Sequence, residues 1–382
     1  MSGPPRASVA LLVGAVAVTG ANAMLLSPLT QLVGTDLGVA PTEVLRASQS
    51  YGLATLLSAL IFAPQIGRIG LDRALGGALL ALAAGFVWIA LAPSLPALQN
   101  AHLLAGLASG VALPACYGLA AAIAPDGQTA KTMGRVLFGW TLLLIFGVAG
   151  AAVIAEIAGW RVAYGVFAGL TLGLAIVSQR ARLPHQKARP VNLLSVFRLE
   201  GFALALGALA ALMLGFYAAM TLIGTHVTVT LGRSTASAGL IPLVYGLGFG
   251  VGTILDPLAD RFGRARVAPL LLALLSLCYF AMVLTAPYFG PLLVVIFVWG
   301  VFQHVTLTLA MDRLAQLAHT QRAAILGLST AVTYGAVFLG AVIGRALFTH
   351  VGFWAIAGVS MIFAAALTAE ALARHYSSNN SV

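Results

Sequence analysis

The segment with the most reactive side chains in this sequence is a short charged stretch at residues 255–267, LDPLADRFGRARV. Its charged side chains are two acids and three arginines: Asp256, Asp260, Arg261, Arg264 and Arg266. Carboxylate and guanidinium groups at this spacing can form ion pairs, and arginine also binds lipid phosphate. Gly263 allows a sharp turn of the backbone. We therefore expect a charged turn that keeps the ends of two apolar helices in water.

Four further side chains could carry a proton near or within the apolar runs. His304 lies near the middle of the run at residues 290–314, and Asp312 lies close to its end. Glu156 and His102 lie near the ends of two other runs. Ionisable groups at membrane depth are costly, and histidine changes charge near neutral pH. These four are our candidates for proton coupling. The alternatives are a structural ion pair for Asp312, an interfacial position for Glu156 and a single interhelical hydrogen bond for His304.

The composition shows what kind of element must position these groups. Of 382 residues, 60% are hydrophobic and 8% are charged, whereas soluble domains carry about a quarter charged residues. The chain is therefore an integral membrane protein. Its net charge of +10 resides in the connections between apolar runs, so it favours a fixed membrane orientation over nucleic-acid binding. The only two cysteines, Cys116 and Cys278, exclude a disulfide framework and a four-ligand metal site.

Twelve apolar runs are long enough to be transmembrane helices. In the first half they are residues 9–31, 45–66, 75–92, 99–123, 134–156 and 161–179; in the second they are 201–224, 235–255, 267–286, 290–314, 323–346 and 353–373. The first run resembles a cleavable signal, but it continues to about Leu29, so we interpret it as an uncleaved helix. The fold class expected is all-α, with twelve transmembrane helices in two six-helix bundles.

The distribution of basic residues predicts the orientation. With both termini in the cytoplasm, all Lys and Arg residues except Arg46, Arg161, Arg233 and Arg345 lie inside, as the positive-inside rule requires. The predicted domains are an N-terminal bundle (1–179), a basic, proline-containing cytoplasmic linker (180–199) and a C-terminal bundle (200–382). The localisation expected is a bacterial inner membrane.

The two halves repeat one another around the charged turn. Residues 63–70 (APQIGRIG) follow the second run as residues 256–263 (DPLADRFG) follow the eighth, with Gly67 in the place of Asp260. Parallel repeats of this kind build transporters around a site near the middle of the membrane. We expect the turn residues Arg68, Gly70, Asp256, Asp260, Arg261, Gly263 and Arg264 to take part in gating.

The turn, the basic linker and the twelve runs resemble the major facilitator superfamily over the whole chain. Residues 147–152 (GVAGAA) and the later Gly-Trp-Arg at 159–161 resemble the drug:proton antiporter branch, especially its arabinose- and sugar-efflux-like members. Ala149 stands where that motif has proline, and His102 stands where the branch has an arginine on helix 4. The resemblance implies that the turn's Asp260 locks an outward-facing state, and that Gly147 and Gly150 belong to a gating helix.

The resemblance also implies that helices 1, 4, 7 and 10 line a central cavity, with helices 2, 5, 8 and 11 beside them. The uncharged polar and aromatic residues on these helices are the substrate-cavity candidates: Asn22, Tyr51, Tyr117, Trp140, Tyr217, Thr221, Tyr245, Gln303, His304, Thr333 and Tyr334. Polar groups in lipid need partners and tend to face inward. Such a cavity suits a neutral or amphipathic small molecule.

We predict a secondary transporter that exports a small organic molecule by alternating access, coupled to proton entry. The alternative on the same fold is an importer or facilitator of a small metabolite. A membrane enzyme is disfavoured because the sequence contains no H-E-x-x-H, G-x-x-x-x-G-K-[ST] or G-x-S-x-G motif. We expect no catalytic residue, no cofactor and no metal; the expected partners are the substrate, protons and lipids, with the protein a monomer.

Overall fold

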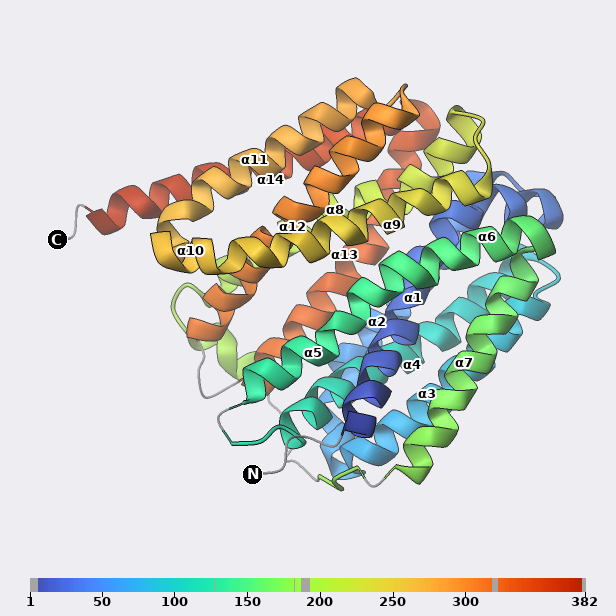
Figure 1. The fold of residues 1–382 in the computed structure, drawn as a ribbon, viewed down its shortest axis with the longest axis horizontal. Helices are drawn as coiled ribbons and strands as arrows, with labels where there is room; N and C mark the ends of the chain where they lie inside the picture. The colour runs from blue at the N-terminus through green and yellow to red at the C-terminus, as the bar shows by residue number, and fades with distance from the viewer. Residues whose placement is uncertain (1–5, 127, 182, 187–192, 318–321, 380–382) are drawn as a thin grey trace.

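The helices of the first half are separated by short turns in the computed structural model, which describes residues 6–126, 128–181, 183–186, 193–317 and 322–379. They are α1 (Arg6–Leu37), α2 (Pro41–Ile61), η1 (Ala63–Arg68), α3 (Leu71–Leu91), α4 (Leu95–Ala122), α5 (Thr129–Leu142), η2 (Leu143–Val148), α6 (Ala149–Ala158) and α7 (Trp160–Arg180). The segments α5, η2 and α6 follow one another without a break and form the fifth long helix (Figure 1).

The second half repeats this order. Its elements are η3 (Leu193–Arg198), α8 (Phe202–Thr225), η4 (His226–Thr230), α9 (Thr235–Gly252), η5 (Thr253–Leu255), α10 (Asp256–Phe262), α11 (Arg264–Thr285), α12 (Phe289–Leu317), α13 (Arg322–His350) and α14 (Phe353–Asn379). The predicted linker at 180–199 lies partly outside the described residues, which omit 182 and 187–192.

The predicted all-α membrane fold is confirmed. Eleven helices within the described ranges are long and apolar enough to cross a membrane. The remaining predicted run, at residues 45–66, corresponds to α2, which is 21 residues long but more polar than the other eleven. Large apolar side chains on the outside, such as Ile157 (81% exposed) and Leu91 (72% exposed), face the surroundings, as expected where the solvent is lipid.

The two halves lie side by side and meet along three helix pairs (Figure 1). Helix α1 packs against α8, α2 against α13, and α6 with η2 against α9. Glycines allow these approaches: Gly52 lies under the backbone of Phe338, and Gly224 lies against the backbone of Ser27 and Pro28. Small residues at such contacts are how helices associate closely in lipid.

The charged stretch at residues 255–267 is helical except at Gly263, which corrects the expectation that the whole stretch is a turn between two helices. Helix α9 continues through η5 into α10, so Asp256 and Asp260 lie on its last turns. Pro257 stands at the start of α10, where a missing N–H costs nothing, and no helix breaker follows until Gly263. Gly263 then makes the turn alone, with φ of 86°. Gly70 has the same role in the first half, with φ of 95°.

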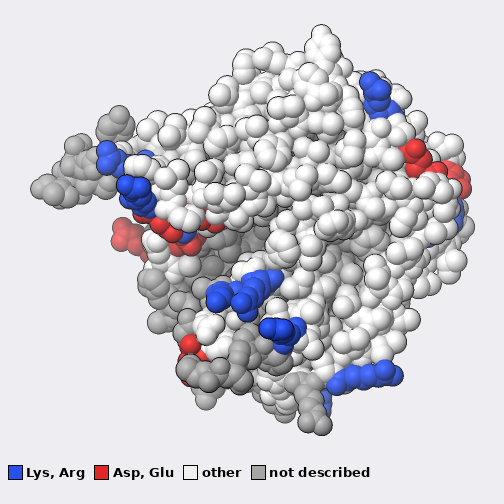
Figure 2. Space-filling view, in the orientation of Figure 1, with Lys and Arg blue, Asp and Glu red and all other residues white. Residues whose placement is uncertain are grey.

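We use "terminal end" for the end of the molecule at which α1 begins and α14 ends, and "opposite end" for the other. The two halves are in contact at the opposite end, where α6 runs beside α9. Towards the terminal end they diverge, and α5 and α10 are well separated in Figure 1. Figure 2 shows a hollow between the halves on this face.

Candidate functional site

Four tyrosines from four helices gather where the halves meet. Tyr51 on α2 and Tyr334 on α13 come from different halves, and their rings meet edge to face with centroids 5.8 Å apart. The hydroxyl groups of Tyr217 on α8 and Tyr334 both lie within electrostatic range of those of Tyr51 and Tyr117 on α4. The structure therefore brings four of the predicted cavity residues into one cluster.

Two hydrogen bonds within the first half support this tyrosine cluster, and one of them comes from the predicted cavity residue Trp140. The Tyr51 hydroxyl on α2 donates a hydrogen bond of 2.9 Å to the Thr19 carbonyl on α1, which fixes the position of the tyrosine against α1. The indole Nε1 of Trp140 donates to the Tyr117 hydroxyl at 3.4 Å. The same indole ring lies against Gly20, where a Cβ would come within 2.6 Å of it. Gly20 thus leaves the room that the indole occupies.

Asn22 and Thr221 are buried polar side chains on the helices that face each other across the halves, α1 and α8. Neither the amide oxygen and nitrogen of Asn22 nor the hydroxyl of Thr221 has a hydrogen-bond partner among the described residues. Asn22 is 0% exposed and Thr221 is 3% exposed. Buried polar groups are almost always hydrogen-bonded, so unpaired ones at an interface between moving parts suit a bound molecule or water.

The other cavity candidates lie on helices of the second half. Tyr245 packs within the second half, against Phe216 and Trp299, at ring distances of 5.3 and 4.8 Å. Gln303 is buried beside His304 on α12, and its amide has no partner among the described residues. Thr333 is half-buried on α13.

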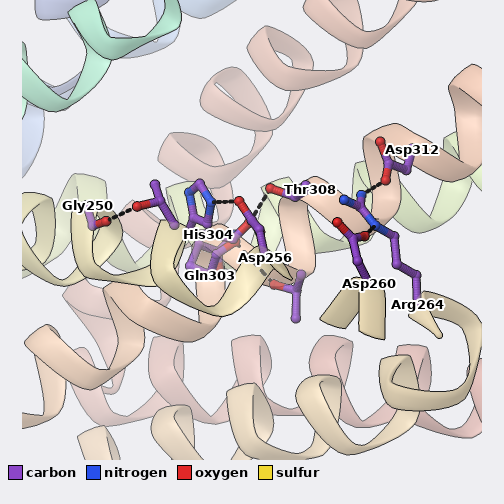
Figure 3. Close-up of polar contacts among 10 residues, drawn as sticks. Gly250, Asp256, Asp260, Arg264, Gln303, His304, Thr308 and Asp312 are labelled. Atoms are coloured by element: carbon purple, nitrogen blue, oxygen red, sulfur yellow. Dashed lines mark hydrogen bonds and ion pairs between the residues drawn. The ribbon is translucent and has the colours of Figure 1, made fainter. Parts of the chain in front are cut away.

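His304 pairs with Asp256 instead of lining the tyrosine cluster. Its Nε2 lies 3.0 Å from Asp256 Oδ2, joining α12 to the start of α10 (Figure 3). The side chains are 14% and 29% exposed, respectively. The ring of Phe249 packs edge-on against His304 with centroids 4.7 Å apart. A histidine and a carboxylate in contact can take up or release a proton as their surroundings change.

Arg264 connects the turn to helix α12. Its guanidinium contacts both Asp260 on α10 and Asp312 on α12 (Figure 3). Since Arg264 is the first residue of α11, this ion-pair triad ties three helices of the second half together at the terminal end. The partner that Asp312 needed from another helix is therefore Arg264.

The remaining predicted gating residues behave differently from this triad. Arg68 donates to the side chain of Gln65 at 3.1 Å on an exposed surface, and Arg261 is exposed. Gly147 packs against Leu143 within its own helix, and nothing lies near a Cβ position at Gly150. The atoms nearest to a Cβ at Gly147 belong to its own half.

Polar contacts close the opposite end of the molecule, and sequence reasoning missed most of them. Glu43 on α2 accepts from Arg345 on α13 at 2.6 Å, and its second oxygen lies 2.6 Å from Arg46. Glu156 on α6 accepts from the backbone N–H of Ala236 on α9, also at 2.6 Å. The available signal was that Arg345 and Arg46 are two of the four basic residues expected outside.

Hydroxyl groups add a third contact between the halves at this end. The Thr30 and Thr225 hydroxyls are 2.8 Å apart, and Ser27 donates to the Met220 carbonyl at 3.0 Å. His102 takes no part in it. His102 is buried within the first half, with Nδ1 2.9 Å from the Leu98 carbonyl.

The described residues hold no group of three or more His, Cys, Asp or Glu placed to bind a metal ion. The arrangement is one of a buried, uncharged cluster between two halves, with ion pairs at both ends. This is the organisation of a transporter, in which a central site is alternately exposed.

The sequence matches the Major Facilitator Superfamily over residues 11–255 and 204–380, and the chain belongs to this family. It is therefore a membrane transporter of small molecules. It is similar to the uncharacterized MFS-type transporter YwfA of Bacillus subtilis (25% identity; 89% of this chain and 86% of the relative covered). The inner membrane transport protein YdhP of Escherichia coli K12 is 27% identical (82% and 80% covered). A chloramphenicol resistance protein of Streptomyces lividans is 25% identical (76% of each covered).

Proposed function

We propose that this protein exports a neutral or amphipathic small organic molecule in exchange for protons, as in the drug:proton antiporter branch. The observation that carries the proposal is the buried cluster of tyrosine, Asn22 and Thr221 side chains at the meeting of the halves, which holds no carboxylate or ammonium group. A charged substrate would leave its charge uncompensated there. The Streptomyces lividans relative is a chloramphenicol resistance protein, which supports export.

The terminal end faces the cytoplasm in this proposal, and the protein is a monomer of the inner membrane. The hollow at the terminal end would then admit substrate from the cytoplasm, while the contacts of Glu43, Glu156 and Thr30 close the outer side. This is the inward-open state that an exporter must adopt to load its substrate.

Proton coupling is assigned here to the His304–Asp256 pair, which lies on the second half towards the same end. The other candidates are Asp312, which Arg264 engages, Glu156 at the outer contact and the buried His102. His304–Asp256 is preferred because it unites a titratable ring and a carboxylate at a partly exposed position.

The test is proton-driven flux in proteoliposomes with candidate neutral drugs, sugars and nucleosides. Wild-type protein is expected to accumulate substrate against its gradient when a pH gradient is imposed, and His304→Ala is expected to abolish accumulation while downhill movement persists. His350→Ala, at an exposed histidine of α13, is the matched control and should behave as wild type. Downhill movement alone in the wild type, insensitive to pH, would establish the facilitator alternative.

A separate variant tests the site itself. Asn22→Leu keeps the approximate volume but removes both amide groups, so we expect the apparent KM for a transported compound to rise about tenfold, in line with the loss of hydrogen bonds to a buried ligand. Thr285→Val is the control: this half-buried residue lies on α11 of the second half, its hydroxyl donates to the Ala281 carbonyl of its own helix, and its loss is expected to change KM less than twofold. An unchanged KM in Asn22→Leu would remove Asn22 from the site.

A further inference from the structure

The fifth long helix (α5, η2 and α6) contacts α9 of the other half. The pairing of residues in this contact can be extrapolated along both helices to the region where the halves separate. Gly246 lies against Leu144, and Gly250 lies against Thr141, so the two helices run antiparallel in contact. Beyond these residues α5 and α10 diverge towards the terminal end (Figure 1). Equal numbers of residues along both helices therefore reach the same depth in the molecule.

Asp256 lies six residues beyond Gly250, and Arg135 lies six residues before Thr141. Six residues of helix advance about 9 Å on each side, so these two residues occupy equivalent depths on the facing helices. By the same count of ten residues, Asp260 is level with Lys131. Two basic residues on the first half thus lie at the same depths as two acids on the second.

The distribution of charge in Figure 2 agrees with this register. Lys and Arg side chains lie below the hollow, and Asp and Glu side chains gather on its upper left side with further Lys and Arg side chains beside them. Arg135 and Lys131 are both exposed and form no ion pair with any residue that the structure describes. Asp256 is occupied by His304, within its own half.

We propose that Asp256 exchanges partners during transport, pairing with His304 while the terminal end is open and with Arg135 when that end closes. The proposal rests on alternating access in the proposed function. Closure brings α5 and α10 together, and an arginine–carboxylate pair then forms where there was a hollow. The exchange links the state of His304 to closure, because Asp256 must leave the histidine before Arg135 can bind it.

The consequence is that Arg135 and His304 compete for one carboxylate. Losing Arg135 favours the open state, and losing His304 favours the closed state. Losing Asp256 removes both contacts and is not informative alone. Opposite shifts from two single substitutions are what distinguish an exchange from general destabilisation, because a protein that merely folds poorly shifts in one direction.

The experiment measures the distance between the helices with two spin labels in lipid nanodiscs. Labels replace the exposed Leu137 and Leu258, in a background in which the buried Cys116 and Cys278 are alanine. Pulsed electron paramagnetic resonance then reports a long distance for the open state and a short one for the closed state. No substrate flux is measured, so a negative result leaves the transport proposal to its own assay.

Arg135→Gln is expected to reduce the short-distance population at least threefold, and His304→Ala to increase it at least threefold. The charge exchange Arg135→Asp with Asp256→Arg should bring the short-distance fraction to at least the wild-type value, because the new arginine at position 256 cannot pair with His304. Arg73→Gln is the matched control, since Arg73 is exposed on α3, away from the contact between the halves, and it should leave both populations unchanged.

Three results would overturn the partner exchange. They are a short-distance population unaffected by Arg135→Gln, a shift of both single variants in the same direction, and a charge-exchanged protein no better than its worse single variant. A wild-type protein whose terminal ends never approach would overturn it as well.

Discussion

The turn at Gly70, before α3, and the turn at Gly263, before α11, occupy equivalent places in the two halves. Different interactions hold the helix that follows each turn against its neighbour. In the second half, Arg264 at the start of α11 binds Asp312 on α12. In the first half, Leu71 starts α3 and lies against α4 at Gly118, where a Cβ would come within 2.7 Å of it. The same helix-to-helix contact is therefore ionic in one half and apolar in the other.

What the two turns share is the backbone. Gly70 and Gly263 both have positive φ and both directly precede a long helix. The comparison separates two tasks: the glycine makes the turn in both halves, while an arginine ties the turn to the carboxylate of a neighbouring long helix in the second half. At the first turn the described polar pair is Asp72 with His185, 2.9 Å apart. We infer that conformational control by charge is concentrated in the second half, and that the first turn is mainly architectural.

The largest effect should come from breaking the ion pairs of Arg264 in the second half. Arg264→Leu introduces the residue of the first copy and leaves Asp260 and Asp312 without their cation. Two carboxylates then repel one another, and we expect the transport rate to fall about tenfold, a size typical of coupling between sites. Proteoliposome flux per folded protein measures this.

A compensated variant sharpens the same comparison. Asp260→Gly, Arg264→Leu and Asp312→Gly together copy the apolar contact of the first half. This triple variant is expected to fold as well as wild type, as judged by its thermal unfolding midpoint, but to stay slow in transport. Full transport activity in the triple variant would show that the ion pairs are merely structural.

An effect of intermediate size is expected at the two shared glycines. Gly70→Ala and Gly263→Ala force a side chain into a backbone conformation that L residues avoid, which should lower the free energy of unfolding by about 1–2 kcal/mol each. Gly70→Ala should be the worse of the two, because a Cβ there would also meet the ring of His185. Chemical unfolding in detergent, with Gly77→Ala on an open face of α3 as control, measures the difference. Wild-type stability in both variants would contradict the shared backbone role.

The smallest effect is expected from Arg68→Ala. Arg68 contacts only the side chain of Gln65 among the described residues, on an exposed surface, so its loss should change stability by less than about 0.5 kcal/mol. Arg261→Ala, at the equivalent place in the second turn, is the paired measurement. A large loss of transport in Arg68→Ala would give the first turn a gating role and break the distinction drawn above.

Much of this architecture could be read from the sequence because lipid imposes simple rules. Apolar length gave the helices, basic residues gave an expected orientation, and the repeated turn indicated two related halves. The extent of the helix formed by α9, η5 and α10 was not predictable. Its charged residues suggest a loop, and only the position of Gly263 decides where the helix ends.

Side-chain contacts between helices that are distant in the sequence could not be predicted either. His304 has the composition of a cavity residue, but its partner depends on where α10 passes α12, which no local pattern specifies. Tyr51, Tyr117, Tyr217 and Tyr334 were selected by residue type and expected helix, and the structure brings them together. Glu43 and Arg345 were not selected, because each looks like an ordinary loop charge until the halves are assembled.

The polarity of α2 has a consequence for how the protein is made. This helix carries Glu43, Arg46, Gln49 and several hydroxyl side chains, so it gains little from contact with lipid alone. One of its main packing partners, α13, begins 261 residues after α2 ends. At the usual rate of translation that interval lasts about 15–50 s. During that time the side of α2 that later contacts α13 is covered only by lipid, the insertion machinery or a membrane chaperone. The first half must therefore stay in the membrane without this contact until the second half has been synthesised.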